Sequence, residues 1–388
     1  GARAGLRAVV DSESFLSEES ERPSFGYTRA AVWARARFAP QGDGPWLLEV
    51  AHPQLDHLAV HVRTRSGGFR SFTTGDATPF ATRPTRHRTF VFPMPEDAAR
   101  PFEVYVRTTS SGSIVLPLRF FRPGEFAEHA AAAELGFGLY YAFLLAMAIY
   151  NLFLFVASRE KGYLFYVSYL ASFALFQAAL EGHAYRWLWP EAPWLASSMT
   201  GVALALALAS GCLFVRKMLE LAARGDGRAL RYAAIVLAAS VPLFFLAYPV
   251  AIRGLTLGAV VVIVGIVVVM VRALARGERA ARYLVAAFAA VVPGGLALAA
   301  RQLELAPSSF WTEHLVKIGT AAEAIILSFA LADRLDRLTR REAEAQAKLL
   351  VLERGFAMRE LARLDEERRR LALELHDGLG QTLLALAS

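Results

Sequence analysis

The chain has 388 residues, of which 55% are hydrophobic and only 20% charged, and its formal net charge at pH 7 is +7. So high an apolar fraction excludes an ordinary soluble globular protein and favours a membrane protein. Most Lys and Arg residues lie in loops between apolar segments or near the C-terminus, so membrane topology explains the charge better than nucleic-acid binding. The only cysteine, Cys212, lies in an apolar segment, and no disulfide framework is expected.

Residues 1–125 predict an all-β outer domain. Apolar residues alternate with polar ones over short stretches that turn residues separate, and these stretches are 46–50, 58–62, 90–92 and 102–106. This pattern is typical of an antiparallel jelly-roll sandwich. We expect the domain to end near Arg122-Pro123-Gly124, which would serve as a linker to the helices.

Candidate ligands of a metal or a small molecule also lie in this domain. His57 and His61 share a strand face, but four residues along a strand span about 13 Å, which one zinc ion cannot bridge. We therefore expect surface histidines and no metal site. The aromatic residues are expected mainly to form the core; they are Tyr27, Trp33, Trp46, Phe69, Phe72 and Tyr105. Trp33, which could stack on a sugar, and the charged Asp76 and Arg83 near Gly75 are the candidate ligand-binding residues.

Seven membrane spans are predicted over residues 131–332. Six runs lack Asp, Glu, Lys and Arg, and they cover residues 135–158, 162–180, 192–215, 232–252, 254–271 and 283–300. Each is long enough to cross about 30 Å of hydrocarbon at 1.5 Å per residue. The seventh, residues 310–332, is interrupted by His314, Lys317 and Glu323.

Basic residues predict the orientation. Eleven Lys and Arg residues lie in the loops after spans one, three and five, and three, Arg186, Arg253 and Arg301, lie in the alternate loops. The positive-inside rule then places the N-terminal domain outside and the C-terminal helix in the cytoplasm.

The ionisable residues of the seventh span are functional candidates, because charges at membrane depth are costly. Glu313 and Lys317, four residues apart, are predicted to pair near the outer interface. Lys317 and Glu323 project to different faces and should not pair. A lysine on a seventh helix also raises the alternative of a light-driven or transport protein, but the other apolar cores hold no aspartate counter-ion.

A long charged helix should follow the seventh span, because residues 324–375 contain no proline and only one glycine, Gly355. Its length would be about 75 Å. Apolar residues fit two registers with an offset between them: Leu335, Leu338, Ala345, Leu349, Leu352 and Phe356, then Leu361, Leu364, Leu371 and Leu375. Over residues 333–367 this favours a parallel coiled-coil dimer whose register can relay motion. The alternative is a solvated helix with an incidental apolar stripe.

His376 is the candidate catalytic residue on this helix. Its imidazole is largely neutral at cytoplasmic pH and can accept a phosphoryl group if it is positioned and its proton is managed. Asp377 could fix the tautomer of the ring, and Gln381, one turn beyond Asp377, could orient a water molecule. From composition alone, a single helix histidine is more often structural.

Residues 367–381, ERRRLALELHDGLGQ, closely resemble the phosphoacceptor box of sensor histidine kinases of the nitrate/nitrite-sensor and membrane-thermosensor subfamily. Leu373 stands where that family more often has Arg. The resemblance implies that His376 is phosphorylated from ATP, that Asp377 acts as base, and that Gln381 supports dephosphorylation of a response regulator. Residues 368–388 would begin the dimerisation and phosphoacceptor domain. ATP and Mg would bind a catalytic domain that this segment lacks, so the segment alone should be inactive.

The rest of the chain resembles the bacterial seven-transmembrane receptors with diverse intracellular signalling modules. The matching residues are Gly26-Tyr27, Ala31-Val32-Trp33, Gly75-Asp76, Pro79-Phe80, Arg83, Lys317-Ile318-Gly319, Glu323 and Leu331-Ala332-Asp333-Arg334-Leu335. This resemblance implies a jelly roll similar to carbohydrate-binding modules.

Together, the two resemblances imply a homodimeric sensor histidine kinase of the bacterial inner membrane. It would detect an unknown small-molecule or carbohydrate-like ligand and contact a response regulator and membrane lipid, but no nucleic acid directly. The alternative is a receptor without its own kinase that docks a separate signalling protein.

Overall fold

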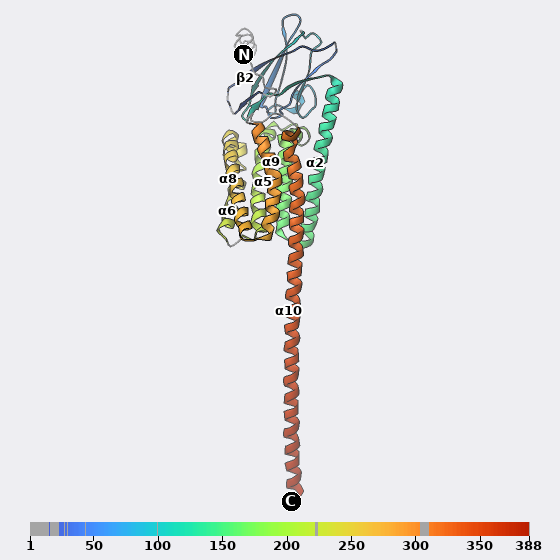
Figure 1. Cartoon of the computed structure of the whole chain (residues 1–388), viewed down its shortest axis with the longest axis vertical. Coiled ribbons are helices and arrows are strands. Elements are labelled where there is room, and N and C mark those ends of the chain that lie inside the picture. Colours follow the sequence, from blue (N-terminus) through green and yellow to red (C-terminus); the bar gives the residue numbers. More distant parts are fainter. Residues whose placement is uncertain are drawn as a thin grey trace. The chain divides into compact units, whose positions relative to one another are not determined.

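A computed structural model describes residues 15, 23–26, 28, 30–42, 44–98, 100–221, 224–302 and 310–387 of the chain. It divides into two compact units, Gly1–Leu331 and Ala332–Ser388. The first unit contains a β domain followed by packed helices, and the second consists of the later turns of the last helix (Figure 1).

The β domain is an antiparallel sandwich. One sheet has the strand order β2 (Val32–Phe38), β7 (Phe102–Thr109), β4 (His57–Arg63) and β5 (Phe69–Thr74). The other has the order β6 (Phe90–Pro93), β3 (Leu47–Val50) and β9 (Leu118–Phe121). A two-stranded pair joins β1 (Ser24–Gly26) to β8 (Ile114–Val115), and the short 3-10 helix η1 (Phe80–Thr82) lies between β5 and β6.

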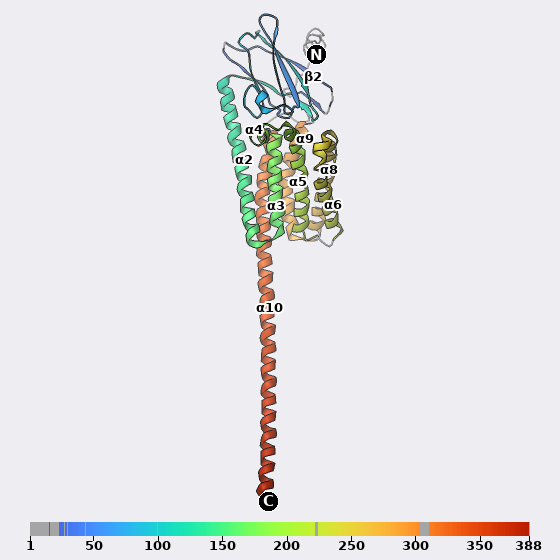
Figure 2. The same cartoon turned by 180° about the vertical axis from the view of Figure 1, so that it is seen from behind.

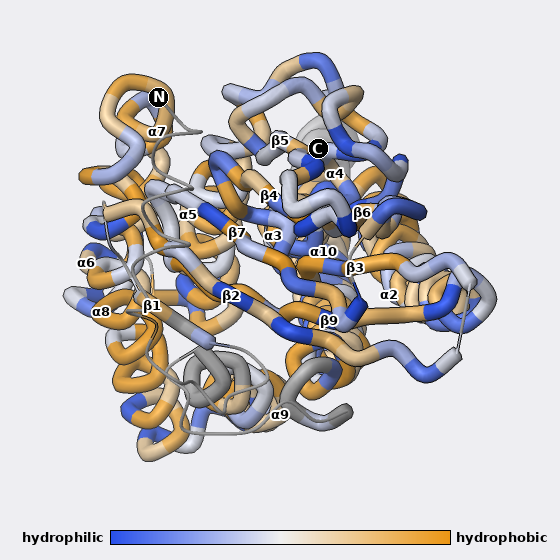
Figure 3. Tube along the Cα trace, turned by 90° about the horizontal axis from the view of Figure 1, so that it is seen from above, coloured by the Kyte–Doolittle hydropathy of each residue, from blue (hydrophilic) through white to orange (hydrophobic). Residues whose placement is uncertain are grey.

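Side chains that alternate along the strands form the sandwich core, as predicted. Leu58, Val60 and Val62 of β4 are fully buried, and so are Leu48 and Val50 of β3 in the other sheet. Successive strand residues point to opposite faces of a sheet, so this alternation buries one face of each strand. Seen from above, hydrophilic and hydrophobic colours alternate along β2, whereas hydrophobic colours predominate on α8 (Figure 3).

The helical part begins with α2 (Pro123–Ser158), α3 (Lys161–Leu180), the short α4 (His183–Trp187) and α5 (Pro193–Met218). It continues with α6 (Gly225–Ala239), α7 (Leu243–Leu246), α8 (Tyr248–Ala275), α9 (Arg279–Gln302) and α10 (Phe310–Ala387). Within the described residues, seven segments are long and apolar enough to cross a membrane, with α6 and α7 together forming the fourth. The prediction of seven spans is thus confirmed (Figure 2).

The predicted boundary between spans four and five is wrong. The fourth span ends at Leu246 and α8 begins at Tyr248, so Arg253 lies within α8 rather than in a loop. Arg301 likewise lies within α9. Pro249 occupies the first turn of α8, where a missing N–H leaves no hydrogen bond unmade. In a continuous apolar run, this helix start is hard to distinguish from the helix interior.

The predicted linker between the outer domain and the first span is also wrong. Strand β9 ends at Phe121 and α2 begins at Pro123, so only Arg122 separates them. The Arg122 backbone N–H donates to the Glu125 carboxylate at 3.0 Å, which caps the helix at once. Proline is favoured at the first helical position because its φ already suits a helix.

The second unit is helical throughout its described residues, which confirms the prediction of a long C-terminal helix. Apolar positions of both predicted registers are exposed in the single chain: Leu349, Leu352, Phe356, Leu361, Leu364, Leu371 and Leu375. A parallel dimer would bury such a stripe, and the pairing itself stays a prediction.

Candidate functional site

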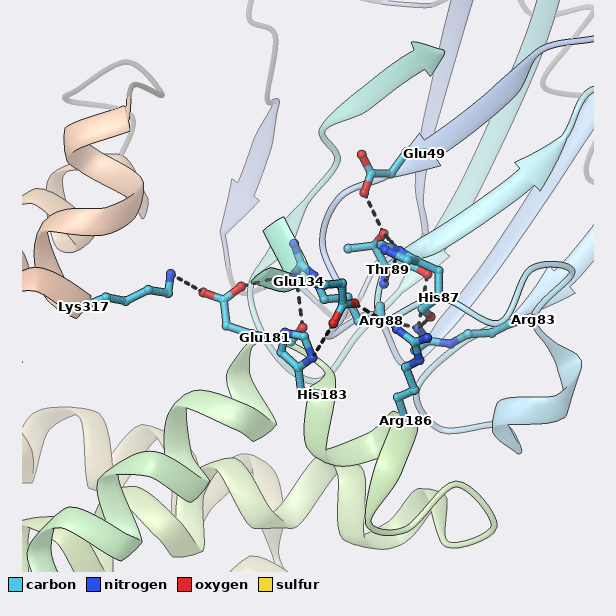
Figure 4. A network of polar contacts seen from close by, with 10 residues as sticks. All are labelled: Glu49, Arg83, His87, Arg88, Thr89, Glu134, Glu181, His183, Arg186 and Lys317. Atoms are coloured by element: carbon cyan, nitrogen blue, oxygen red, sulfur yellow. Dashed lines mark hydrogen bonds and ion pairs between the residues drawn. The ribbon is translucent and has the colours of Figure 1, made fainter. Parts of the chain in front are cut away.

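A polar junction joins the sandwich to the helices (Figure 4). The sandwich contributes the loop of residues 83–89, between η1 and β6. The helices contribute Glu134 of α2, the turn between α3 and α4, and Lys317 of α10. Segments far apart in the sequence thus meet through charged side chains.

Glu181, the C-cap residue of α3, contacts both sides of this junction. Its Oε1 lies 3.0 Å from Lys317 Nζ, and its Oε2 lies 3.4 Å from Arg88 Nη1. The Arg88 guanidinium and the Lys317 ammonium also lie over the ring of Phe137, at 4.7 and 4.8 Å from its centroid. The side chain of Arg88 is only 14% exposed and that of Lys317 only 13%, so solvent screens their ion pairs with Glu181 incompletely.

Gly182 allows the α3–α4 turn to approach the sandwich loop closely. Its φ of +81° lies in the left-handed region, and an added Cβ would lie 2.6 Å from the Arg88 carbonyl oxygen and 2.8 Å from Pro53 Cβ. Only glycine adopts this conformation at low cost and leaves this space open. The turn therefore brings Glu181 within reach of Arg88.

Two buried histidines flank the ion pairs. Burial, with Arg88 nearby, lowers the pKa of His183 to about 4, and burial together with Arg88, Arg186 and Arg83 lowers the pKa of His87 to about 3. Both imidazoles are therefore neutral near pH 7. Glu134 instead pairs with Arg186 at 2.9 Å, which ties α2 to α4.

Asp76 and Arg83, two of the candidate ligand-binding residues, lie together on the sandwich side of the junction and are 6% and 4% exposed. Arg83 Nη1 donates to the carbonyls of His87 and Arg88 at 3.0 and 2.7 Å. Arg83 thus shapes the loop that presents Arg88. Burial and the neighbouring Asp56 raise the pKa of Asp76 to about 8. Tyr185 of α4 donates to the Thr78 carbonyl nearby.

Trp33, the third candidate, lies elsewhere, on the outer face of the four-stranded sheet. Its ring stacks on His61 at 5.9 Å between centroids. His61 is 7% exposed and its Nδ1 lies 2.7 Å from Ser71 Oγ, so the prediction that it is a surface histidine is wrong. His57 is exposed. Among the described residues, no group of three or more His, Cys, Asp or Glu could hold a metal ion.

Comparisons with known proteins assign the two halves of the first unit. Residues 1–122 match the family model described as 7TMR-DISM extracellular 2, and residues 133–334, more than half of the chain, match the model described as 7TM diverse intracellular signalling. The chain belongs to the 7TM diverse intracellular signalling family. It is a multi-pass membrane protein with a sensor domain. No curated protein matches the chain.

Because the chain belongs to the 7TM diverse intracellular signalling family, the polar junction is the place where the extracellular domain meets the membrane spans. Both family matches end before residues 367–381, the predicted phosphoacceptor box. The backbones of His376, Asp377 and Gln381 belong to α10, and their side chains lie outside the described residues. Tyr27 also lies outside them.

Within the bundle of this 7TM diverse intracellular signalling protein, α3 holds α10 through tyrosine hydroxyls. Tyr169 donates to the Glu323 carboxylate at 2.8 Å, and Tyr166 donates to the Ala324 carbonyl at 2.8 Å. Tyr163 donates to the Leu331 carbonyl at 3.1 Å. Glu323 thus has its hydrogen-bond partner on α3, in agreement with the prediction that it does not pair with Lys317. The Glu313 side chain, predicted to pair with Lys317, lies outside the described residues.

Sequence reasoning missed Arg88, Glu181 and the three tyrosines. The tyrosine spacing of three residues places them on one face of α3 and was a visible signal. No local pattern marks Arg88 or Glu181, because their partners are distant in the chain: Arg88 is 93 residues from Glu181, and Lys317 is 136 residues from it.

Proposed function

We propose that this chain is the sensor part of a dimeric, ATP-dependent histidine kinase, in which the polar junction couples the outer sandwich to α10. The observation that carries the proposal is the double contact of Glu181, which pairs with Arg88 of the sandwich and with Lys317 of α10. The helix that receives this contact is also the helix on which His376 lies.

The relay works through competition for one carboxylate. A displacement of the loop of residues 83–89 changes how Glu181 divides between Arg88 and Lys317, and so changes what holds the first turns of α10. A signal moves such an equilibrium only by the difference in free energy between its two states. The two apolar registers of α10 supply two packings between which a dimer can switch.

His376 is the proposed end point of the relay. In the resemblance to sensor histidine kinases, His376 accepts a phosphoryl group from ATP, Asp377 acts as the base and Gln381 supports dephosphorylation of the response regulator. ATP and Mg would be bound by a separate catalytic domain. The excess of basic residues in the loops after spans one, three and five supports a cytoplasmic location of the C-terminal part of α10, with the spans in the bacterial inner membrane.

Phosphorylation of the full-length protein with labelled ATP tests this function. We expect the wild type to incorporate phosphate and His376→Gln to lose it, because glutamine offers no nucleophilic nitrogen. The matched control is His57→Gln, which alters an exposed histidine of the sandwich and should leave incorporation unchanged. Equal incorporation by the wild type and His376→Gln contradicts the proposed role.

A second function is a receptor that docks a separate signalling protein instead of carrying its own kinase. The exposed apolar residues of α10, such as Leu352 and Leu361, favour it because another protein's helix could cover them as well as a second copy could. The gene sequence beyond the codon for Ser388 separates the two functions. A Gly- and Asn-rich ATP-binding domain there supports the kinase and ends the alternative.

A further inference from the structure

A cavity of about 430 Å³ lies beside the junction. The sandwich lines it with Glu49 of β3, Arg119 of β9 and Arg88, and the helices line it with Phe137, Glu181 and Lys317. Its volume lies within the range of small-molecule sites, which extends from about 300 to 1,000 Å³.

The charges on the cavity wall favour an anion. Three fixed cations, Arg88, Arg119 and Lys317, stand against two carboxylates, Glu49 and Glu181. Within the described residues, the Nε of Arg88 is buried and has no hydrogen-bond partner. Arginine binds carboxylates through paired N–H donors, so a carboxylate on the ligand suits this wall.

Glu49 places a second chemical requirement on the ligand, a hydrogen-bond donor. Its side chain is 2% exposed, its Oε1 accepts a hydrogen bond from Thr89 Oγ1 at 2.7 Å, and no described residue donates to its buried Oε2. Leu48 and Val50, its neighbours on β3, point into the sandwich core, so Glu49 faces the opposite side, toward the cavity. A buried carboxylate oxygen needs a donor, and a hydroxyl group of a ligand is one.

We propose that this cavity binds a small hydroxycarboxylate. The ligand carboxylate contacts Arg88 and Arg119, a ligand hydroxyl donates to Glu49 Oε2, and the carbon skeleton lies against Phe137. The signalling consequence rests on the function proposed above: a second carboxylate beside Arg88 and Lys317 competes with Glu181 for them. The ligand thus acts on the contact that joins the sandwich to α10.

Calorimetric titration of the 388-residue protein in detergent micelles tests the site without any reading of phosphorylation. The probes are L-malate and D-gluconate, their neutral analogues butane-1,2,4-triol and sorbitol, succinate as malate without its hydroxyl, and inorganic phosphate. We expect saturable binding of at least one hydroxycarboxylate, at least tenfold tighter than that of its neutral analogue and of phosphate.

Three variants locate the binding. Arg119→Gln should weaken it tenfold or more, and Glu49→Gln should abolish the preference for malate over succinate. Arg70→Gln, in an exposed ion pair of the same sandwich, should leave it unchanged. Each variant must elute as a monodisperse species, and Glu49→Gln preserves the test if Arg119→Gln does not fold.

The site is overturned if the folded wild type binds none of the hydroxycarboxylates, binds phosphate or the polyols equally well, or binds unchanged in both cavity variants. This failure is distinct from failure of the proposed function, because a protein that does not bind the probes still phosphorylates His376 if the kinase assignment is correct. Conversely, hydroxycarboxylate binding by a protein that never incorporates phosphate retains the site and removes the kinase.

Discussion

Lys317 of α10 lies 3.0 Å from the carboxylate of Glu181, and that carboxylate also contacts Arg88 of the outer sandwich. One acidic side chain is thus shared between two cations from different parts of the fold. The Glu181 side chain is 25% exposed, so water screens it less than it screens a surface pair. A partly buried group with two partners is sensitive to small displacements of either, which suits a relay.

A double-mutant cycle on Glu181→Gln and Lys317→Met should give a coupling free energy of about 0.5–3 kcal/mol, because each change leaves the other charge without its partner. The measurement is denaturant unfolding of the protein in detergent. The control cycle uses Arg70→Gln and Asp97→Asn, whose side chains are 62% and 57% exposed. This surface pair should couple by no more than about 1 kcal/mol. Additive effects at Glu181 and Lys317 contradict the relay contact.

Gly182→Ala should destabilise the protein more than Gly67→Ala. Both glycines have φ of +81°, so both changes carry the same backbone penalty of about 1–2 kcal/mol. An added Cβ meets nothing within 4 Å at Gly67 but lies 2.6 Å from the Arg88 carbonyl oxygen at Gly182. The difference between their thermal unfolding midpoints isolates the close approach at the junction. Equal midpoints would mean that the α3–α4 turn shifts to accommodate the added methyl group with no loss of stability.

Asp76 should make the stability of the outer domain fall as the pH rises from about 4 to about 8. Burial and Asp56 raise its pKa from 3.8 to about 8 in the folded state, so the folded protein binds a proton that the unfolded chain has released. Stability therefore declines as pH rises toward and through 8. His87, with its pKa lowered from 6.5 to about 3, acts in the opposite direction and raises stability as the pH rises between these two values.

Asp76→Asn should remove the decline, since asparagine keeps a donor for Asp56 and carries no charge. Thermal unfolding followed at pH 6.5, 7 and 8, above the range in which His87 acts, measures the effect. Asp97→Asn, at an exposed position of the same sandwich, is the control and should keep the wild-type slope. A wild-type stability that is flat over this range contradicts the assignment.

Tyr169→Phe should cost about 1–3 kcal/mol of unfolding free energy, because it leaves a buried oxygen of Glu323 without its donor. Tyr150→Phe on α2 removes the same hydroxyl from a ring that is 49% exposed and should cost less than about 0.5 kcal/mol. In the Glu323→Gln background the cost of Tyr169→Phe should shrink, since no carboxylate remains to be satisfied. Equal costs for the two phenylalanine variants would remove Tyr169 from the contacts that hold α10.

Local periodicity accounts for what could be predicted. The alternation of Leu58, Val60 and Val62 predicted a strand with one buried face, and long apolar runs predicted the spans, because each signal repeats within a few residues. The break between α7 and α8 was misplaced, since Ala247 and its neighbours stay apolar through the turn. The pairing of Glu181 with Arg88 could not be predicted from the sequence, because it forms only when the sandwich packs against the helices.

Two of the predicted ligand-binding residues lie at the junction, and the third does not. Asp76 and Arg83 are predicted ligand contacts because they lie near a turn glycine; Arg83 also stabilises the loop that presents Arg88, and the ligand contacts stay a prediction. Trp33 is separated from them because it lies on the opposite face of its sheet from the core. The phosphoacceptor prediction at His376 depends on a local motif and awaits the phosphorylation experiment.

The single residue between β9 and α2 limits how the sandwich can move. Arg122 leaves no slack in the chain, and its guanidinium lies 4.7 Å from the ring of Trp46, which holds the crossing to the sandwich core. The loop of residues 83–89 provides a second attachment to the helices. Tyr185 and Thr200 of the helices hold the sandwich at further points, through the Thr78 carbonyl and the Gln54 amide, and a rigid body held at several places has little freedom to rotate. In the proposed relay, a stimulus therefore cannot swing the sandwich freely, and it would reach Lys317 as a short, directed displacement.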